Sequence, residues 1–286
     1  MLCGYFFLAS STQAQYCKVL EGLSMKSSIL GKDVRYSVIL PPDYEISVRS
    51  YPLVYLLHGY TDNETGWVQF GEAQMIAGRA MTDQSIPPMI IIMPDGGVSW
   101  YINDYLGKEK WEDMFVQELI PFIDKTYRTR PEKQYRGIAG LSMGGYGSLI
   151  NSMRHPDLFT ACAAFSAGVL TDEEIASWPE DSWDQMFGQL YGKNLTGTDR
   201  LTEHWKKYSV INLAETLPED QLKSIRIWID CGDDDFLAIG NASLHIALTK
   251  RHISHEYRVR DGSHTWEYWR TGLVDGLRFI GKDFHR

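Results

Sequence analysis

The strongest chemical signal in the sequence is a serine flanked by glycines. Residues 140–144 read Gly-Leu-Ser-Met-Gly, directly after an apolar stretch that is typical of a strand and directly before a stretch that is typical of a helix. In this G-x-S-x-G pattern the glycines allow a sharp strand-to-helix turn, which holds the serine hydroxyl clear of the sheet. The pattern predicts that Ser142 is a nucleophile for acyl transfer, and a purely structural turn serine is the alternative.

A serine nucleophile requires a base, and the histidines are the first candidates. The base is normally a histidine whose tautomer is fixed by a carboxylate, and both partners are expected in loops after later strands of the sheet. His264 follows the predicted strand 256–260, whereas His245 falls in the middle of a predicted helix. His252 and His255 precede that strand and would lie at its wrong end. The sequence therefore favours His264.

Four aspartates compete for the role of the acid. Asp230 stands at the end of the strand predicted over 225–229, while Asp233, Asp234 and Asp235 occupy the loop after it. The required chain order of serine, acid and histidine fits all of them. Spacing alone does not choose among the three loop residues.

Acyl transfer also requires donors for the oxyanion, which are usually two backbone N–H groups. One comes from the residue after the nucleophile and the other from the loop after an early strand. Met143 would supply the first donor, and either Gly59 or Tyr60, after the predicted strand 53–57, would supply the second. His58 is interpreted as structural.

The surrounding pattern predicts an α/β fold with a mostly parallel sheet. Two strands, 19–29 and 33–40, are predicted to form an antiparallel edge. Short unbroken apolar runs then alternate with helical stretches, as a parallel sheet covered on both faces requires. These runs are 53–57, 88–93, 135–139, 159–166, 225–229 and 256–260. The clearest helix is predicted over 110–127, with Pro121 kinking it or starting a new turn, and others begin at Met143, near Asn241 and near Thr265.

Residues 168–224 interrupt this alternation. So long a connection is usually functional or has helices of its own, and we interpret it as a lid or cap; a packed surface excursion is the alternative. No linker divides the chain, so residues 16–286 are expected to form a single domain.

Composition restricts the partners. The formal net charge is −9 over 286 residues, which leaves no basic surface for nucleic acid. No cysteine or histidine pair has the spacing of metal ligands, so neither a metal nor a cofactor is expected. Cys162 and Cys231 fall in apolar, strand-like runs, and buried free thiols are expected rather than a disulfide.

Residues 1–15 resemble the later part of a secretory signal peptide, although no Lys or Arg precedes Lys18. Their apolar run of about eight residues is too short to span a bilayer. We therefore expect a protein without a membrane partner, secreted or periplasmic.

Several motifs together resemble those of the esterase-D superfamily, and within it the feruloyl and acetyl-xylan esterases. The resemblance runs from about Val34 to the C-terminus. The motifs are Leu57-His-Gly59, Pro94-Asp-Gly-Gly97 with Ser99-Trp-Tyr101, Trp111-Glu112 through Glu118-Leu-Ile-Pro121, Gly140 to Gly145, Asp230-x-Gly-x-x-Asp235, and Gly262-Ser-His-Thr-Trp266.

The resemblance implies an α/β-hydrolase fold, with Asp235 as the acid and Tyr60 as the second oxyanion donor. It implies a serine esterase that removes feruloyl or acetyl groups from xylan-type polysaccharide. A general carboxylesterase, a thioesterase of the S-formylglutathione hydrolase kind and an acyltransferase are the alternatives. Trp100, Tyr101 and Trp266 are the candidates for contact with an aromatic acid or a sugar ring, and ordinary packing is the alternative for each.

Overall fold

The centre of the molecule is a mixed, mostly parallel sheet. The structure is a computed structural model that describes residues 17–284, in which eight strands form one sheet of order β1-β2-β4-β3-β5-β6-β7-β8. β1 and β2 form the predicted antiparallel edge, and β3 to β8 run parallel to one another. The strands are β1 (Lys18–Ser27), β2 (Lys32–Leu40), β3 (Leu53–Leu57), β4 (Ile90–Pro94), β5 (Arg136–Leu141), β6 (Ala161–Phe165), β7 (Arg226–Gly232) and β8 (His255–Arg260). The α/β-hydrolase fold class predicted from the sequence is confirmed.

The strand order reverses around β3. The chain passes from β3 to β4 on one side and later returns to β5 on the other side. Leu57 at the end of β3 is paired with Gly140 near the end of β5, so the loops after these two strands start side by side. In open α/β sheets, ligands bind at the carboxyl ends of the strands where the order reverses.

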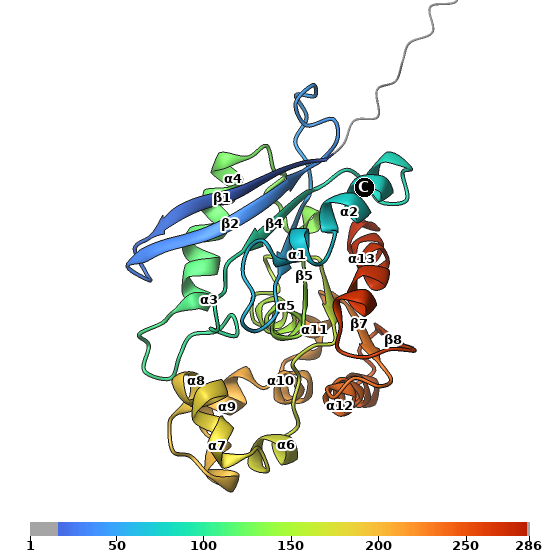
Figure 1. Ribbon diagram of the computed structural model, residues 1–286. Helices are drawn as coiled ribbons and strands as arrows, with labels where there is room; N and C mark the ends of the chain where they lie inside the picture. The colour runs from blue at the N-terminus through green and yellow to red at the C-terminus, as the bar shows by residue number, and fades with distance from the viewer. Residues whose placement is uncertain (1–16, 285–286) are drawn as a thin grey trace, which may run out of the picture.

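Helices cover both faces of the sheet, as the apolar strands require. Val54 packs in the cluster beneath α2 and α13, while its neighbour Tyr55 packs in the cluster on the opposite face. Figure 1 shows α2 and α13 side by side on their face. That face carries α1 (Gly66–Gln69), α2 (Ala73–Thr82) and α13 (Trp266–Gly281), and the other carries α3 (Trp111–Met114), α4 (Ile120–Thr126), α5 (Met143–Arg154) and α12 (Ala238–Lys250).

The helix predicted over 110–127 is divided by a wider turn. A π-helical segment, η1 (Phe115–Leu119), separates α3 from α4, and Pro121 stands at the start of α4. Proline has no N–H to continue the helical hydrogen bonds, and the change of register lies immediately before it. Pro121 thus starts a new turn, which was one of the two predicted outcomes.

The segment 168–224 folds into short helices, and Figure 1 shows α6, α7, α8 and α9 together at one end of the molecule. Buried Arg200 holds them together, because its guanidinium donates hydrogen bonds to the carbonyl oxygens of Leu195, Ile175, Ala176 and Trp178. The helices are α6 (Asp172–Ala176), α7 (Glu180–Trp183), η3 (Asp184–Gly188), α8 (Gln189–Tyr191), η4 (Gly197–Arg200), α9 (Glu203–Tyr208), α10 (Val210–Thr216) and α11 (Glu219–Lys223). The movement of this segment as a lid remains a prediction.

A buried carboxylate joins this segment to the body. Glu112 accepts hydrogen bonds from the Tyr208 hydroxyl (2.6 Å), Arg154 Nε (2.7 Å) and His155 Nε2 (2.8 Å). Burial raises the pKa of Glu112, but these hydrogen bonds and the Arg154 charge outweigh burial and lower the pKa to about 2. The charged form of Glu112 therefore stabilises the attachment of the segment.

The structure also describes the cysteines and the start of a predicted helix. Cys162 and Cys231 are free and buried, as predicted, and Cys17 is free and buried as well. Within residues 17–284, no helix has the length and apolar character needed to cross a bilayer. α12 begins at Ala238 rather than near Asn241. Residues 1–15, with the proposed signal remnant, lie outside the described residues.

The Glu112 network predicts a pH-dependent loss of stability. A lowered pKa in the folded state stabilises the protein above the unfolded pKa of about 4.3, and this stabilisation disappears as the pH falls towards 2. Glu112→Gln should therefore lower the free energy of unfolding by about 3 kcal/mol at pH 7, and by much less near pH 3. Chemical unfolding of wild type and variant at both pH values measures this, and a difference that does not shrink on acidification contradicts it.

Candidate active site

Ser142 occupies a strained turn between β5 and α5. Its backbone has φ 54° and ψ −118°, a conformation that residues other than glycine rarely adopt. The Ser142 N–H donates to the carbonyl oxygen of Phe165 (2.9 Å). A Cβ atom at Gly144 would lie 2.4 Å from the carbonyl oxygen of Leu57, so only glycine lets α5 begin this close to β3. The predicted strand-to-helix turn is thus present.

Three of the predicted residues form one hydrogen-bonded chain. His264 Nε2 lies 2.9 Å from Ser142 Oγ, and His264 Nδ1 lies 3.0 and 3.1 Å from the carboxylate oxygens of Asp235. With the proton on Nδ1, the imidazole donates to Asp235 and accepts from the serine hydroxyl. Ser142 follows β5, Asp235 follows β7 and His264 follows β8, so parallel strands bring together residues that are far apart in the sequence.

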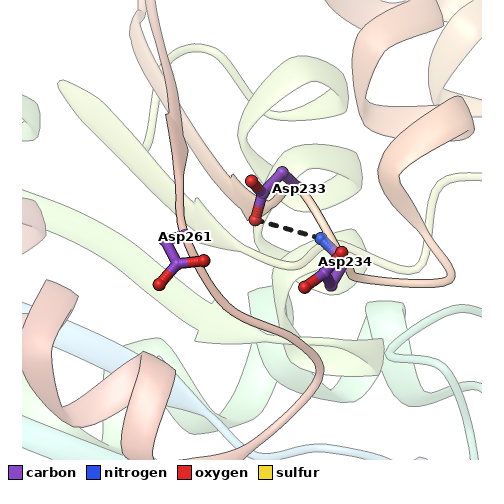
Figure 2. Close-up of side chains that lie close together, drawn as sticks. All are labelled: Asp233, Asp234 and Asp261. Carbon is purple, nitrogen blue, oxygen red and sulfur yellow. Dashed lines mark hydrogen bonds between the residues drawn. The ribbon is translucent and has the colours of Figure 1, made fainter.

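The structure separates the three loop aspartates. Asp235 is only 4% exposed, whereas Asp233 and Asp234 are exposed. Figure 2 shows these two with Asp261 in a surface cluster, where Asp233 accepts hydrogen bonds from the N–H groups of Asp234 and Gly262. Exposed acidic clusters are common on proteins, and we assign no function to this one. Of the three, Asp235 is the one that reaches His264.

The surroundings of Asp235 keep it ionised. Burial raises the pKa of its carboxyl, but hydrogen bonds from His264, from the Leu237 N–H and from Ser166 outweigh burial, and the net shift is downward. Trp269 Nε1 in turn donates to Ser166 Oγ (3.0 Å). Ser166 was missed from the sequence because no motif marks it. Its position just after β6, at the same edge of the sheet as the other loops, was the available signal.

The predicted oxyanion donors also lie beside Ser142. A Cβ atom at Gly59 would lie 3.6 Å from Ser142 Cβ, so the loop after β3 contacts the nucleophile turn. In the described part of the chain, neither the Tyr60 N–H nor the Met143 N–H donates to a backbone acceptor. Both groups remain available to an oxyanion, as this role requires.

His58 fixes the direction of the Tyr60 N–H. Its Nδ1 lies 2.8 Å from the carbonyl oxygen of Gly59, and its Nε2 accepts from the Gly96 N–H at 2.8 Å, which places the ring proton on Nδ1. The Gly59 carbonyl and the Tyr60 N–H belong to one planar trans peptide, so they point in opposite directions. Holding the carbonyl therefore aims the N–H. The interpretation of His58 as structural agrees with these contacts.

A cavity of about 320 Å³ opens beside Ser142 and His264. Its wall is mainly apolar and aromatic, and Trp100 and Trp266, two of the predicted contact residues, line it. The other side chains that line the cavity are those of Tyr60, Asp62, Leu141, Leu170, Trp178, Met186, Phe236, Leu237 and Trp269.

Tyr101 is a correction. It is fully buried and does not line the cavity; its hydroxyl donates to the carbonyl oxygen of His58 (2.8 Å) and its ring packs on Trp111. A side chain enclosed in this way cannot stack on a ligand. Tyr101 instead supports the loop after β3, which carries Tyr60.

The sheet topology, the turn at Ser142 and the hydrogen-bonded chain to Asp235 define an α/β hydrolase. Such an arrangement can transfer an acyl group, because it holds a hydroxyl, a base, an acid and two free N–H donors around one point.

A comparison of the sequence with models of protein families identifies the family of this chain. The model of the family described as "Putative esterase" matches residues 27–280, so the chain belongs to this esterase family. An esterase of Mycobacterium tuberculosis is 28% identical over 261 residues, which cover 84% of this chain and 54% of that protein. The chain thus spans about half the length of this curated relative.

Two further similarities extend the comparison. An endo-1,4-β-xylanase/feruloyl esterase of Xylanibacter ruminicola is 34% identical over 163 residues, which are 54% of this chain and 22% of that protein. A solved structure of a ferulic acid esterase superposes with a TM-score of 0.81 at 31% identity, covering 94% of this chain and 99% of the other. The resemblance to esterase-D enzymes inferred from the motifs is confirmed.

The geometry predicts that the loop aspartates differ in their effects. Asp235→Asn should lower kcat by about three orders of magnitude or more, because an amide cannot hold His264 in the required tautomer or stabilise its charged form. Asp233→Asn, a matched change in the same loop, should leave kcat within about twofold. Steady-state hydrolysis of an aryl ester measures both, and equal losses would contradict the assignment of Asp235.

The His58 contacts predict a second effect on turnover. His58→Leu removes one of two donors to the Gly59 carbonyl oxygen and leaves the Asp62 N–H (3.2 Å). It should lower kcat by up to about a hundredfold, which is the scale of losing one oxyanion donor. His58→Asn retains a short donor and should lose less. Thermal unfolding of both variants provides the control for misfolding. A fully active, folded His58→Leu protein would show that the Tyr60 N–H needs no such support.

Proposed function

We propose that this protein is a serine carboxylic-ester hydrolase that removes feruloyl or acetyl groups from plant cell-wall polysaccharide of the xylan type. The observation that carries the proposal is the aromatic cavity directly beside the hydrogen-bonded Ser142, His264 and Asp235. It rests also on the similarity to a ferulic acid esterase and to a xylanase/feruloyl esterase.

The reaction proceeds in two halves. Ser142 Oγ attacks the ester carbonyl carbon while His264 Nε2 takes its proton, and the N–H groups of Met143 and Tyr60 hold the oxyanion. The carbon–oxygen bond of the ester then breaks, and His264 gives the proton to the departing alcohol. Water, deprotonated by His264, releases the acid from Ser142 by the same steps. Asp235 orients the imidazole and stabilises its charge throughout.

The size and lining of the cavity favour an aromatic acyl group. Ligand sites of about 300 Å³ or more suit molecules with a ring, whereas an acetyl group would fill little of the 320 Å³. Trp100 and Trp178 both line the cavity and both pack on the ring of Phe187, and aromatic pairs add to simple burial of area. A feruloyl group, a substituted phenyl ring on a short chain, satisfies both requirements.

An acylated polysaccharide as partner implies a location outside the cytoplasm. We therefore include a secreted or periplasmic location in the proposal. This location would require residues 1–15 to belong to a secretory signal peptide. We propose no nucleic-acid or membrane partner.

A substrate panel tests the proposal. The purified protein is offered methyl ferulate, acetylated xylan, S-formylglutathione and an acetyl aryl ester, and kcat/KM should be highest for methyl ferulate. Ser142→Ala should lower kcat on every substrate by at least about a thousandfold, because no other hydroxyl takes the acyl group.

The panel also distinguishes the alternatives. A preference for S-formylglutathione would identify a thioesterase, and a uniform response to all esters would identify a general carboxylesterase. Transfer to an added alcohol in place of water would identify an acyltransferase. Undiminished turnover by Ser142→Ala would refute the serine mechanism itself.

A further inference from the structure

The strand β8 ends the central sheet, and its outer edge is open. Among the described residues 17–284, β8 pairs with β7 alone, and Figure 1 shows it at the rim of the sheet beside α12 and α13. Arg258 and Val259 are exposed, and the exposed fraction of Val259 is 54%. The open edge of a sheet presents a row of backbone N–H and C=O groups that can pair with another strand.

The opposite end of the sheet is protected in a way that β8 is not. β1 is the edge strand there, and the register of its pairing with β2 shifts between Leu20 and Leu23. Such an irregularity bends and twists an edge strand, which hinders the approach of a further strand. β8 pairs in unbroken register from His255 to Arg260. Of the two edges, β8 therefore has the regular geometry that an added strand requires.

The hydrogen bonds to β7 show in which direction the backbone groups of β8 point. The Arg260 carbonyl oxygen accepts from the Asp233 N–H (3.1 Å), so the backbone groups of Arg260 face β7. These groups alternate in direction along a strand, so those of Arg258 and Glu256 face β7 as well. The N–H and C=O groups of Tyr257 therefore point away from the sheet, as do those of the residues two positions before and after it.

Two side chains of opposite charge lie on the α13 face of β8. Glu256 and Arg258 are two residues apart and form an ion pair with each other, although their side chains are 39% and 55% exposed. Both line a groove of about 580 Å³ together with residues of α13, so α13 leaves them accessible. Charges along an edge oppose pairing with an arbitrary strand. A strand with charges in the complementary order is the exception.

A second copy of β8, running in the antiparallel direction, has this complementary order. In an antiparallel pair centred on Tyr257, the two Tyr257 residues lie opposite each other and exchange two hydrogen bonds through their outward N–H and C=O groups. Glu256 of each copy then lies opposite Arg258 of the other, which gives two cross-strand pairs of opposite charge. On the α12 face, His255 lies opposite Val259 and covers its exposed side chain.

The neighbouring registers place like charges together. A pair centred on Arg258 sets two arginines against each other, and a pair centred on Glu256 does the same with two glutamates. A pair centred on Val259 places Arg258 opposite Arg260. Like charges directly opposite each other destabilise a pair of strands. The charges of β8 thus select the register centred on Tyr257.

We propose that the protein forms a homodimer through antiparallel pairing of β8 with β8 of a second copy. The pairing joins two sheets of eight strands into one continuous sheet. It is isologous, because each contact occurs twice about a two-fold axis that passes between the Tyr257 residues. The inference does not depend on the substrate or on the reaction.

Charge reversal tests the pairing. Sedimentation of the wild-type protein over a range of concentrations should show a reversible equilibrium between monomer and dimer. Glu256→Arg should weaken the association about tenfold or more, because both cross-strand pairs become pairs of like charge. Arg258→Glu should weaken it for the same reason. The double variant Glu256→Arg/Arg258→Glu restores two pairs of opposite charge and should restore association.

A matched variant separates the pairing from the effect of net charge. Glu45→Arg changes the net charge by the same amount as Glu256→Arg, and it breaks an exposed ion pair with Lys18 of β1, at the opposite edge. It should not weaken association. Both changes make the net charge of −9 less negative, which lowers the general repulsion between copies. Weaker association of Glu256→Arg alone therefore reports the local pairing. Thermal unfolding and aryl-ester hydrolysis check that each variant is folded.

A cross-link tests the register directly. Opposed residues of a hydrogen-bonded pair have Cα atoms about 5.5 Å apart, which a disulfide can bridge. Tyr257→Cys should therefore form a covalent dimer under mild oxidation. Arg258→Cys should not, because the two cysteines would be diagonal neighbours about 7–8 Å apart. The wild-type protein, oxidised in parallel, accounts for the native cysteines.

The outcomes decide the proposal. A wild-type protein that stays monomeric at every concentration overturns it, as does a dimer that neither charge reversal weakens. Failure of the double variant to restore association also contradicts it. A covalent dimer of Arg258→Cys without one of Tyr257→Cys would show a different register and reject the pairing. Restored association together with the Tyr257→Cys cross-link is the result that the pairing requires.

Discussion

The active site depends on the strained backbone of Ser142. Its positive φ is held from several directions: its N–H donates to the carbonyl oxygen of Phe165, and its own carbonyl accepts from Gly168 (2.8 Å) and Tyr146 (3.0 Å). Such strain costs of the order of 1–3 kcal/mol and persists only where the surroundings over-determine it. Here β6, its following loop and the first turn of α5 supply the compensating bonds, and the hydroxyl stands at the edge of the sheet.

The same edge gathers every other group of the site. The loops after β3, β5, β6, β7 and β8 carry Tyr60, Ser142, Ser166, Asp235 and His264 respectively. Parallel strands make this inevitable once their order is set, since all their carboxyl ends meet at one edge. The segment 168–224 then closes one wall of the cavity, and the buried Glu112 joins it to the body.

Much of this arrangement could be predicted from the sequence. The glycines around Ser142 indicate the sharp turn that the structure shows. His264 could be chosen because it is the histidine that directly follows the last predicted strand. Asp235 could not be separated from Asp233 by spacing, because burial distinguishes them and burial is set by neighbours distant in sequence. Only the resemblance to the esterase-D motifs pointed to Asp235 among the three loop aspartates.

Other features were out of reach for physical reasons. Tyr101 and Trp100 are adjacent and both aromatic, yet one is enclosed beneath the loop after β3 and the other lines the cavity; local sequence does not encode which way each ring turns. Most helices of 168–224 are only four to seven residues long, too short for a 3.6-residue period to show, and the run 180–191 is interrupted by the wider turn of η3. Ser166 and Phe236 belong to no motif, and only their contacts reveal them.

The central claim is that the acyl group passes through Ser142. Rapid acid quenching during turnover of methyl ferulate, followed by peptide mass spectrometry, tests it most directly. The account predicts one feruloyl group on the peptide that contains Ser142, and its absence in Ser142→Ala. A feruloyl group on another residue, or product formation with no modified peptide at any quench time, would contradict the account.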